Sequence, residues 1–233
     1  MNVAIIIPVY NHEQRIAEVI GQALKLGLPL FVIDDGSTDS TPTIINHISG
    51  IVVIRHPVNL GKGAALLTGF AAAVGQGCDW AITIDGDGQH LPEDAKSLLR
   101  AVGENRRIIV VGRRQGMVGK NVPWASRFGR GFSNFWVWAA GGPLITDSQS
   151  GFRLYPLPET LYLGVKATRY QFEVEVLVRA KLQGIDTIEA PVQVVYQPKG
   201  ERVSHFLPWP DFKRNSATFS KLICERIFGL FLR

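Results

Sequence analysis

Two aspartates that stand one residue apart are the first feature of this sequence with the chemistry of a site. Asp85 and Asp87 lie in IDGDGQH, residues 84–90, directly after the apolar run WAIT. Like charges this close repel and lose hydration, so proteins usually hold them with a cation or a cluster of donors. Together with Gln89 they offer oxygen ligands at alternate positions, which suits Mg²⁺ or Mn²⁺ bound along with phosphates. A solvated Asp-Gly turn is the alternative, and the spacing excludes an EF-hand calcium loop.

A second acidic pair and a glycine-flanked lysine follow two other apolar runs. Asp34 and Asp35 lie in VIDDGSTDST, and a carboxylate at a strand end can accept a hydrogen bond from a ribose hydroxyl or a base N–H. The alternative is a capped helix N-terminus, although adjacent aspartates cannot both act as caps. Lys62 lies in NLGKGAAL, where an ammonium at the start of a helix can meet a phosphate. A tight strand-to-helix turn explains this motif equally well, because it is neither a dinucleotide fingerprint nor a P-loop.

The elements that would position these residues alternate along the first half of the chain. The pattern predicts strands at 3–10, 29–36, 51–56, 79–87 and 107–114, and helices at 13–27, 39–48, 61–77 and 92–102. Strict alternation predicts an α/β fold, a mainly parallel, twisted sheet with helices on both faces. The strands are continuously apolar, as strands buried on both sides are. Because ligands bind beyond the carboxyl ends of such strands, the acidic pairs are expected at one edge of the sheet.

The regular alternation of strands and helices ends after about residue 115. An aromatic-rich helix is expected at 124–142, a loop and strand at 147–157, an amphipathic helix at 172–184 and an antiparallel strand at 186–198. No linker separates the halves, so residues 1–210 are expected to form one domain, followed by an amphipathic helix at 211–233.

Composition limits the classes of function. The chain has 233 residues, 46% of them hydrophobic, and a formal net charge of +5, which suits an anionic partner. It has no arginine-rich block or aromatic-studded basic strand, which argues against nucleic acid. Two distant cysteines, Cys78 and Cys224, indicate a reduced, cytoplasmic protein, and no apolar stretch is long enough to span a bilayer.

Six motifs taken together resemble a known family. IPVYNHE, VIDDGSTD, NLGKGAAL, IDGDGQH, VVGRR and TDSQSGFRLY occur in the order and rough spacing of family 2 glycosyltransferases, most closely the branch of dolichyl- and polyprenyl-phosphate sugar synthases. The resemblance covers residues 3–155 and extends more loosely to about 206. It implies the GT-A fold, a Rossmann-like single domain that uses Mg²⁺ or Mn²⁺ and a nucleoside-diphosphate sugar, either GDP- or UDP-linked.

The resemblance also assigns roles to individual positions. It implies a nucleotide-sugar site with Asp34 or Asp35 facing the base, a metal and diphosphate site, an arginine near phosphate after Gly112, and a loop near sugar and acceptor that includes Gly151 and Phe152. The residues of the nucleotide-sugar site are Pro8, Tyr10, Asn11, Glu13, Asp34, Asp35 and Lys62, and those of the metal and diphosphate site are Asp85, Asp87 and Gln89. The arginine near phosphate is Arg114, and the loop near sugar and acceptor contributes Asp147, Ser150 and Arg153.

The acceptor decides whether a general base is needed. A metal would neutralise the leaving diphosphate, and Arg114 or Arg153 would add charge-assisted hydrogen bonds. An ionised polyprenyl phosphate needs no base, whereas a hydroxyl acceptor does, and Asp147 is then the first candidate, before Glu173 and Glu175. Both glutamates fit an exposed helix face equally well.

The match loosens toward the C-terminus. YQPKGERVSHF supplies Lys199, Arg202 and Ser204 as acceptor-binding candidates, but its glycine is displaced and His205 replaces the family's lysine. The apolar positions of FSKLICERIFGLFLR, at 219–233, have helical spacing with basic residues between them, which fits a helix at the inner membrane face or one docked on the domain. The aromatics of 124–142 raise the same choice, and core packing is expected for most of them.

The expected function is therefore an inverting, metal-dependent sugar transfer to a lipid-linked acceptor. Sugar nucleotidyl transfer is a second hypothesis, but VYNHEQR lacks the glycines that its first loop usually carries. A non-catalytic, membrane-associated binding module is a third.

Overall fold

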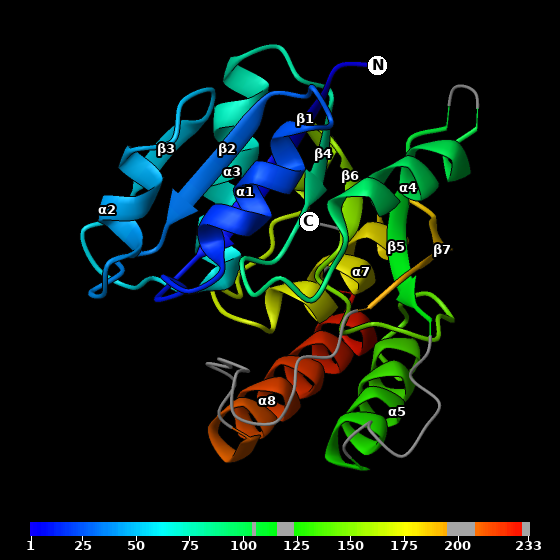
Figure 1. The fold of residues 1–233 in the computed structure, drawn as a ribbon. Coiled ribbons are helices and arrows are strands. Elements are labelled where there is room, and N and C mark those ends of the chain that lie inside the picture. The colour runs from blue at the N-terminus through cyan, green and yellow to red at the C-terminus, as the bar shows by residue number, and fades with distance from the viewer. Residues whose placement is uncertain (104–105, 116–123, 195–207, 230–233) are drawn as a thin grey trace.

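The computed structural model describes residues 1–103, 106–115, 124–194 and 208–229 (Figure 1). The described residues form a seven-stranded sheet in the order β3-β2-β1-β4-β6-β5-β7. The strands are β1 Val3–Val9, β2 Leu30–Asp34, β3 Val52–Arg55, β4 Trp80–Thr83, β5 Ile109–Arg114, β6 Arg153–Pro156 and β7 Thr187–Val192. The expected α/β fold is confirmed, with the five strands of the first half in their expected places.

β6 is the strand that runs against its neighbours. It pairs antiparallel with both β4 and β5, while β7 pairs parallel with β5. The expectation that 186–198 forms an antiparallel strand is therefore wrong. The reason is the path of the chain: α5, which precedes β6, lies beyond the carboxyl edge of the sheet, so β6 enters from that edge (Figure 1). α7 then leads the chain back to the opposite edge, where β7 begins (Figure 1).

Helices cover both faces of the sheet. They are α1 Ile16–Leu24, α2 Thr41–Asn46, α3 Lys62–Gly75, α4 Ala95–Ala101 after a 3-10 turn at Pro92–Asp94, α5 Trp124–Ala139, α6 Glu159–Tyr162, α7 Phe172–Leu182 and α8 Pro208–Ile227. Alternate β1 residues face two separate cores: Ile6 packs with α3 and α7, and Ile5 packs with α1 and α4. The strands are thus buried on both sides, as their continuous apolar sequence predicts.

α7 is not the amphipathic helix that was expected. Its residues from Phe172 to Ala180 are all buried, because α3, α5, α8 and the sheet surround it. Glu173 and Glu175 are therefore buried rather than exposed, at 7% and 3% of their full exposure. A buried carboxylate needs a partner, and both have one.

α5 and α8 lie side by side beyond the carboxyl edge of the sheet, at the bottom of Figure 1. The rings of Trp136 and Phe219 stack between them, with centroids 6.3 Å apart. Core packing is nevertheless wrong for Phe135 and Trp138, which are each 54% exposed. Trp136 is half-buried and packs against the core, and Phe132 is half-buried. These rings lie on a helix that projects from the domain, so neighbours cover one side of it.

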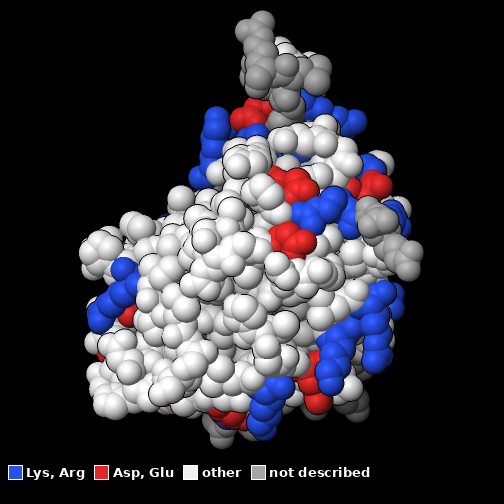
Figure 2. Space-filling model, turned by 90° about the horizontal axis from the view of Figure 1, so that it is seen from above, with Lys and Arg blue, Asp and Glu red and all other residues white. Residues whose placement is uncertain are grey.

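At the end of the molecule away from α5 and α8, the described residues form no continuous basic tract in the view of Figure 2. Seen from above, lysines and arginines stand in separate groups with acidic residues near several of them, around an area without charge (Figure 2). Within the described ranges, no helix is long and apolar enough to cross a membrane. The domain boundary expected at residue 210 falls inside α8.

Candidate active site

A lysine between two carboxylates forms the centre of the candidate site. Asp85 follows β4, Lys62 begins α3, and Glu173 lies in the first turn of α7. The Lys62 Nζ atom lies 2.5 Å from Asp85 Oδ1 and 2.5 Å from Glu173 Oε1. The lysine and glutamate side chains are largely buried, whereas that of Asp85 keeps 23% of its exposure. Three distant segments therefore meet at the carboxyl edge of the sheet.

These charges control one another's protonation. Burial alone would lower the pKa of the Lys62 ammonium, but the carboxylates of Asp85 and Glu173 outweigh burial and raise it far above its usual range. Burial would likewise raise the pKa of Asp85, but Lys62, with smaller effects from His90 and Arg114, holds it below the ordinary value. Both groups are consequently charged at neutral pH, as a site for an anionic, metal-bound ligand requires.

Asp35 fixes the loop that leads into Lys62. Its carboxylate accepts hydrogen bonds from the backbone N–H groups of Leu60 and Gly61, at 2.9 and 2.8 Å, and contacts His56 Nδ1 at 2.8 Å. Gly61 has a φ of +105°, and a Cβ there would collide with the Thr168 carbonyl at 2.5 Å. The start of α3 therefore packs directly on the loop before α7, which brings Glu173 within reach of Lys62.

The other residues of the expected nucleotide site join two loops at the same edge. Pro8 lies in β1, whose residues are all buried, and Tyr10 comes directly after this strand and is half-buried. The Asn11 side-chain oxygen accepts a hydrogen bond from the Thr38 N–H at 2.8 Å, and Glu13 Oε2 accepts one from the Ser40 N–H at 2.9 Å. The loops after β1 and β2 thus form one surface.

Asp34 is turned inward. Its carboxylate is fully buried, accepts a hydrogen bond from the Ser37 N–H at 2.9 Å and lies 3.2 Å from Arg55 Nε. Asp35 is also buried, at 3% exposure. Both carboxylates are buried and bind backbone N–H groups of the loops at the carboxyl edge of the sheet, so neither is exposed at the surface.

Arg114 and Asp147 form a buried pair beside Asp85. Arg114 ends β5, and its Nε and Nη2 atoms donate to the two Asp147 oxygens at 2.8 and 2.7 Å. The Arg114 backbone N–H donates to the same carboxylate at 3.1 Å. Asp147 is fully buried, while Arg114 keeps 17% of its side-chain exposure. A bidentate pair of this kind fixes the plane of the guanidinium, whose positive charge helps to hold the pKa of Asp85 below its ordinary value.

Arg153 has a structural position rather than the expected place at phosphate. Its guanidinium is fully buried and donates to the carbonyls of Ser150, Glu173 and Ser148 at 2.6, 2.7 and 2.7 Å. The guanidinium N–H groups of Arg153 thus donate to the 148–150 loop and to α7. The expectation that Arg153 contacts a phosphate is corrected here, because burial leaves it no route to a ligand.

The loop after Asp147 approaches the site without a side chain. A Cβ at Gly151 would collide with the Asp85 carboxylate and with Lys62 Nζ. Thr83 Oγ1 donates to the Gly151 carbonyl at 2.6 Å and holds the loop down. Ser150, expected near the acceptor, is fully buried, and its hydroxyl has no hydrogen-bond partner among the described residues.

The donor set fits a divalent cation that shares its shell with phosphates. Asp87 is half-buried, and its Oδ1 accepts a hydrogen bond from the Gln89 N–H at 3.0 Å, which bends the loop back toward Asp85. In the described part of the chain, no group of three or more His, Cys, Asp or Glu residues could hold a metal. Two aspartates with ligand oxygens completing the shell is the pattern that Mg²⁺ uses with substrate phosphates.

His90 is a member of the site that the sequence did not reveal. The ring is buried against Phe152, with centroids 5.3 Å apart, and its Nδ1 atom has no partner in the described structure. Burial lowers the pKa of the ring to about 4, despite the Asp85 carboxylate, so the ring is neutral at physiological pH. A histidine after a glycine-rich turn carries no sequence signal of burial, so only tertiary packing could find it.

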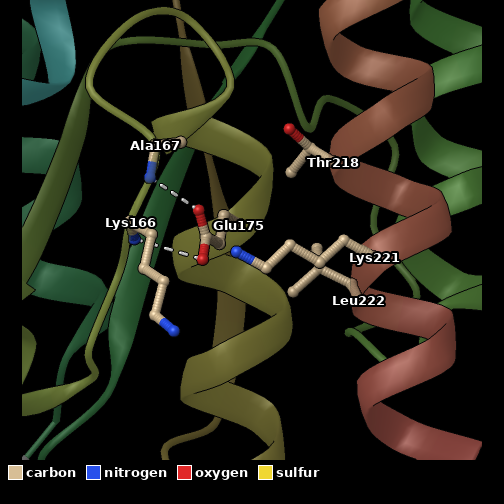
Figure 3. A pocket seen from close by; sticks show the side chains of 6 residues that line it. All are labelled: Lys166, Ala167, Glu175, Thr218, Lys221 and Leu222. Carbon is tan, nitrogen blue, oxygen red and sulfur yellow. Dashed lines mark hydrogen bonds between the residues drawn. The ribbon is translucent and has the colours of Figure 1, made fainter.

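An open pocket of about 160 Å³ lies between α7, α8 and the loop at 166–167 (Figure 3). Glu175 forms part of its wall and accepts hydrogen bonds from the N–H groups of Lys166 and Ala167 and from Arg179 Nε. Arg179 also donates to Glu225 of α8 at 3.0 Å. Glu175 therefore links α7, α8 and the loop, and its pairing with Arg179 makes it a poor base for a substrate proton.

The remaining acceptor candidates lie outside the described residues. These are Lys199, Arg202 and Ser204, together with His205.

Fold and site define a class before any comparison is made. A mainly parallel sheet with acidic residues and a bound lysine at its carboxyl edge is typical of nucleotide-binding α/β enzymes. The family model described as glycosyl transferase family 2 matches residues 4–157, so the chain belongs to this family and is a glycosyltransferase. The resemblance inferred from the six motifs is confirmed.

Relatives agree with this assignment. The chain is 30% identical, over 82% of its length and 85% of the relative's, to a UDP-N-acetylglucosamine–dolichyl-phosphate N-acetylglucosaminyltransferase of Methanococcus voltae. It is 28% identical to an undecaprenyl-phosphate mannosyltransferase of Micrococcus luteus, over 86% of each chain. The crystal structure of residues 1–349 of TarS of S. aureus shares the fold, with 19% identity and a TM-score of 0.52, covering 85% of this chain and 59% of that one.

Proposed function

We propose that this chain transfers a sugar from a GDP- or UDP-linked donor to a polyprenyl phosphate, with inversion at the sugar. The names of the relatives support a lipid-phosphate acceptor. The observation that carries the proposal most is the state of the three candidate bases. Asp147 is bound to Arg114, Glu173 to Lys62 and Glu175 to Arg179. An acceptor that is already ionised needs no base, and a lipid phosphate is such an acceptor.

Each charged residue has a task in this reaction. Asp85 and Asp87, with Gln89 beside them, would hold Mg²⁺ or Mn²⁺, which when bound neutralises the charge that grows on the leaving diphosphate. Arg114, oriented by Asp147, points a fixed cation at the same region and stabilises charge that is larger in the transition state than in the ground state. Tyr10, Asn11 and Glu13 lie on the joined loops that would take the nucleoside.

The α5–α8 pair supports attachment to the inner face of a membrane. Phe135, Trp138, Leu144, Ile227 and Phe228 are 54 to 86% exposed. Four basic side chains of α8 are also exposed, and they are Lys213, Arg214, Lys221 and Arg226. Apolar residues with nearby cations suit an anionic lipid interface. The other side of α8 docks on the domain through Phe219 and Leu222, so the proposed membrane contact involves only the exposed side of this helix.

A transfer assay tests the proposal. The purified chain is given UDP-N-acetylglucosamine or GDP-mannose, Mn²⁺, and either undecaprenyl phosphate or undecaprenol. Product is expected with the phosphate and not with the alcohol. Product from the alcohol alone would refute the argument from the paired bases, and pyrophosphate release from a nucleoside triphosphate and a sugar phosphate would favour nucleotidyl transfer.

Substitution of the metal ligands gives a second test. Asp87→Asn should lower turnover at least about 100-fold, because one ligand loses its charge, while far-ultraviolet circular dichroism is unchanged. The matched control is Asp186→Asn, which removes an exposed carboxylate outside the site. Equal activity of Asp87→Asn and the control would remove the metal assignment.

A further inference from the structure

Lys62 already occupies the carboxylate that the proposed function gives to a metal. Its Nζ atom lies 2.5 Å from both Asp85 Oδ1 and Glu173 Oε1, so these two oxygens are no more than about 5 Å apart. Mg²⁺ and Ca²⁺ hold carboxylate oxygens at about 2.0–2.6 Å. The ammonium therefore stands where the spacing of the two carboxylates would also accept a divalent ion.

Packing holds this arrangement from every side except one. The backbone at Gly61 is anchored by Asp35 and by the loop at Thr168, which fixes the start of α3. The Gly151 backbone closes over Asp85 and Lys62. Glu173 is buried on α7. Asp85 is the most exposed of the three charged groups, at 23%, compared with 15% for Lys62 and 9% for Glu173.

The charges do not balance within the triad. One ammonium faces two carboxylates, each at 2.5 Å, so the net charge of the triad is −1. A dication on Asp85 would be repelled by an ammonium in contact with the same carboxylate. Lys62 must then move toward other negative charge, and the diphosphate of the donor supplies it.

We propose that Lys62 is a resident counter-cation that occupies Asp85 in the donor-free enzyme and turns to the donor's phosphates when metal and donor bind together. Glu173 is the positioning residue that retains the ammonium during this exchange. The inference rests on the proposed function, which supplies the metal and the nucleoside diphosphate. It explains why one lysine has two carboxylate partners, and it predicts that the metal alone binds weakly.

The test measures binding of Mn²⁺ alone, without nucleotide, by calorimetry and by electron paramagnetic resonance. Lys62→Met should bind Mn²⁺ about tenfold more tightly than the wild type, because Asp85 and Glu173 lose their cation and face each other. The double variant Lys62→Met, Glu173→Gln should lose this gain. With GDP or UDP present, the wild type should bind Mn²⁺ at least about tenfold more tightly than without nucleotide.

Two further measurements keep the inference open to refutation if Lys62→Met is unstable. Its melting temperature should rise on addition of Mn²⁺ by more than that of the wild type, since the ion replaces the missing ammonium. Glu173→Gln alone, which keeps an acceptor for Lys62, should weaken nucleotide-dependent Mn²⁺ binding about fivefold, because Lys62 is then held by Asp85. A purely structural Glu173 would leave that affinity unchanged.

The outcomes separate this inference from the proposed function. Mn²⁺ affinity of Lys62→Met equal to or below that of the wild type overturns the role of Lys62, whatever the transfer assay gives. A gain in Lys62→Met that Glu173→Gln does not cancel overturns the claim that Lys62 occupies a divalent-cation position between Asp85 and Glu173, and unchanged nucleotide-dependent Mn²⁺ binding in Glu173→Gln alone overturns the positioning role of Glu173. Absence of sugar transfer by the wild type overturns the proposed function, while the metal-only measurement still decides whether Lys62 occupies a cation site.

Discussion

The buried pair of Arg114 and Asp147 yields a prediction whose size follows from the structure. Asp147→Asn keeps the shape of the side chain but removes the charge that faces the guanidinium. Asp147 is fully buried and accepts three hydrogen bonds from Arg114, at 2.7, 2.8 and 3.1 Å. Removing one partner of a buried pair leaves an uncompensated charge and costs about 3–5 kcal/mol. Because the amide oxygen still accepts one hydrogen bond, we expect the lower end, about 3 kcal/mol.

Thermal and urea unfolding measure this loss. For a chain of this size 1 kcal/mol corresponds to about 2–4 °C, so the melting temperature should fall by about 6–12 °C. In an Arg114→Met background, Asp147→Asn should cost less than about 1 kcal/mol, because the charge it pairs with is gone. The exposed ion pair of Lys181 and Asp186 supplies the matched control, and Asp186→Asn should leave the melting temperature unchanged.

The same variant separates two roles for Asp147 in catalysis. If it orients Arg114, Asp147→Asn lowers kcat through a misplaced guanidinium, and the pH profile keeps its shape. If it is a general base, the variant loses turnover with little loss of stability, and the acidic limb of the pH profile, where the base becomes protonated, disappears. An unaltered melting temperature together with a vanished pH limb would refute the positioning argument.

Three shorter predictions follow from other contacts. Gly151→Ala should lower turnover more than about tenfold, because its Cβ collides with Asp85 and Lys62. Gly75→Ala, which meets nothing within 4 Å and, like Gly151, has no positive φ, is the matched control, and both variants are measured by transfer and circular dichroism. The pKa of His90 is about 4 in the folded protein and about 6.5 in the unfolded chain, so the unfolded state binds more protons between these pH values. The free energy of unfolding should therefore fall by about 3 kcal/mol as the pH is lowered from 6.5 to 4, measured by urea unfolding without metal. His90→Gln should make the free energy of unfolding less dependent on pH in this range. Phe135→Ser with Trp138→Ser should reduce flotation with anionic liposomes severalfold and leave transfer to a detergent-solubilised acceptor intact, and equal flotation would exclude α5 from the membrane contact.

The local pattern of apolar residues was sufficient to predict the strands of the first half and the edge of the sheet where the acidic residues meet. Apolar runs such as VAIIIPV alternate with helical segments, and this local signal predicts parallel strands whose acidic ends meet. The antiparallel strand was misassigned to β7, because direction depends on which edge the chain enters, and residues 186–198 carry no information about that. The burial of α7 was missed for a similar reason: alternating Glu and Val in FEVEV is typical of a half-exposed element, while the partners that satisfy the glutamates lie far away in sequence.

The sequence by itself determined which residues bring charge to the sheet edge: Asp85, Asp87, Lys62, Arg114 and Asp147 are all set by motif and strand position. It also determined the family, since six motifs in register carry more information than any one of them. Only the tertiary structure decided how the charges pair. Ion pairs depend on distances of a few ångströms between segments more than a hundred residues apart, as for Lys62 and Glu173, and no local pattern encodes those distances. For the same reason, only the tertiary structure shows that Arg153 and Glu175 hold neighbouring segments together instead of binding a ligand, and that a neutral His90 is part of the site.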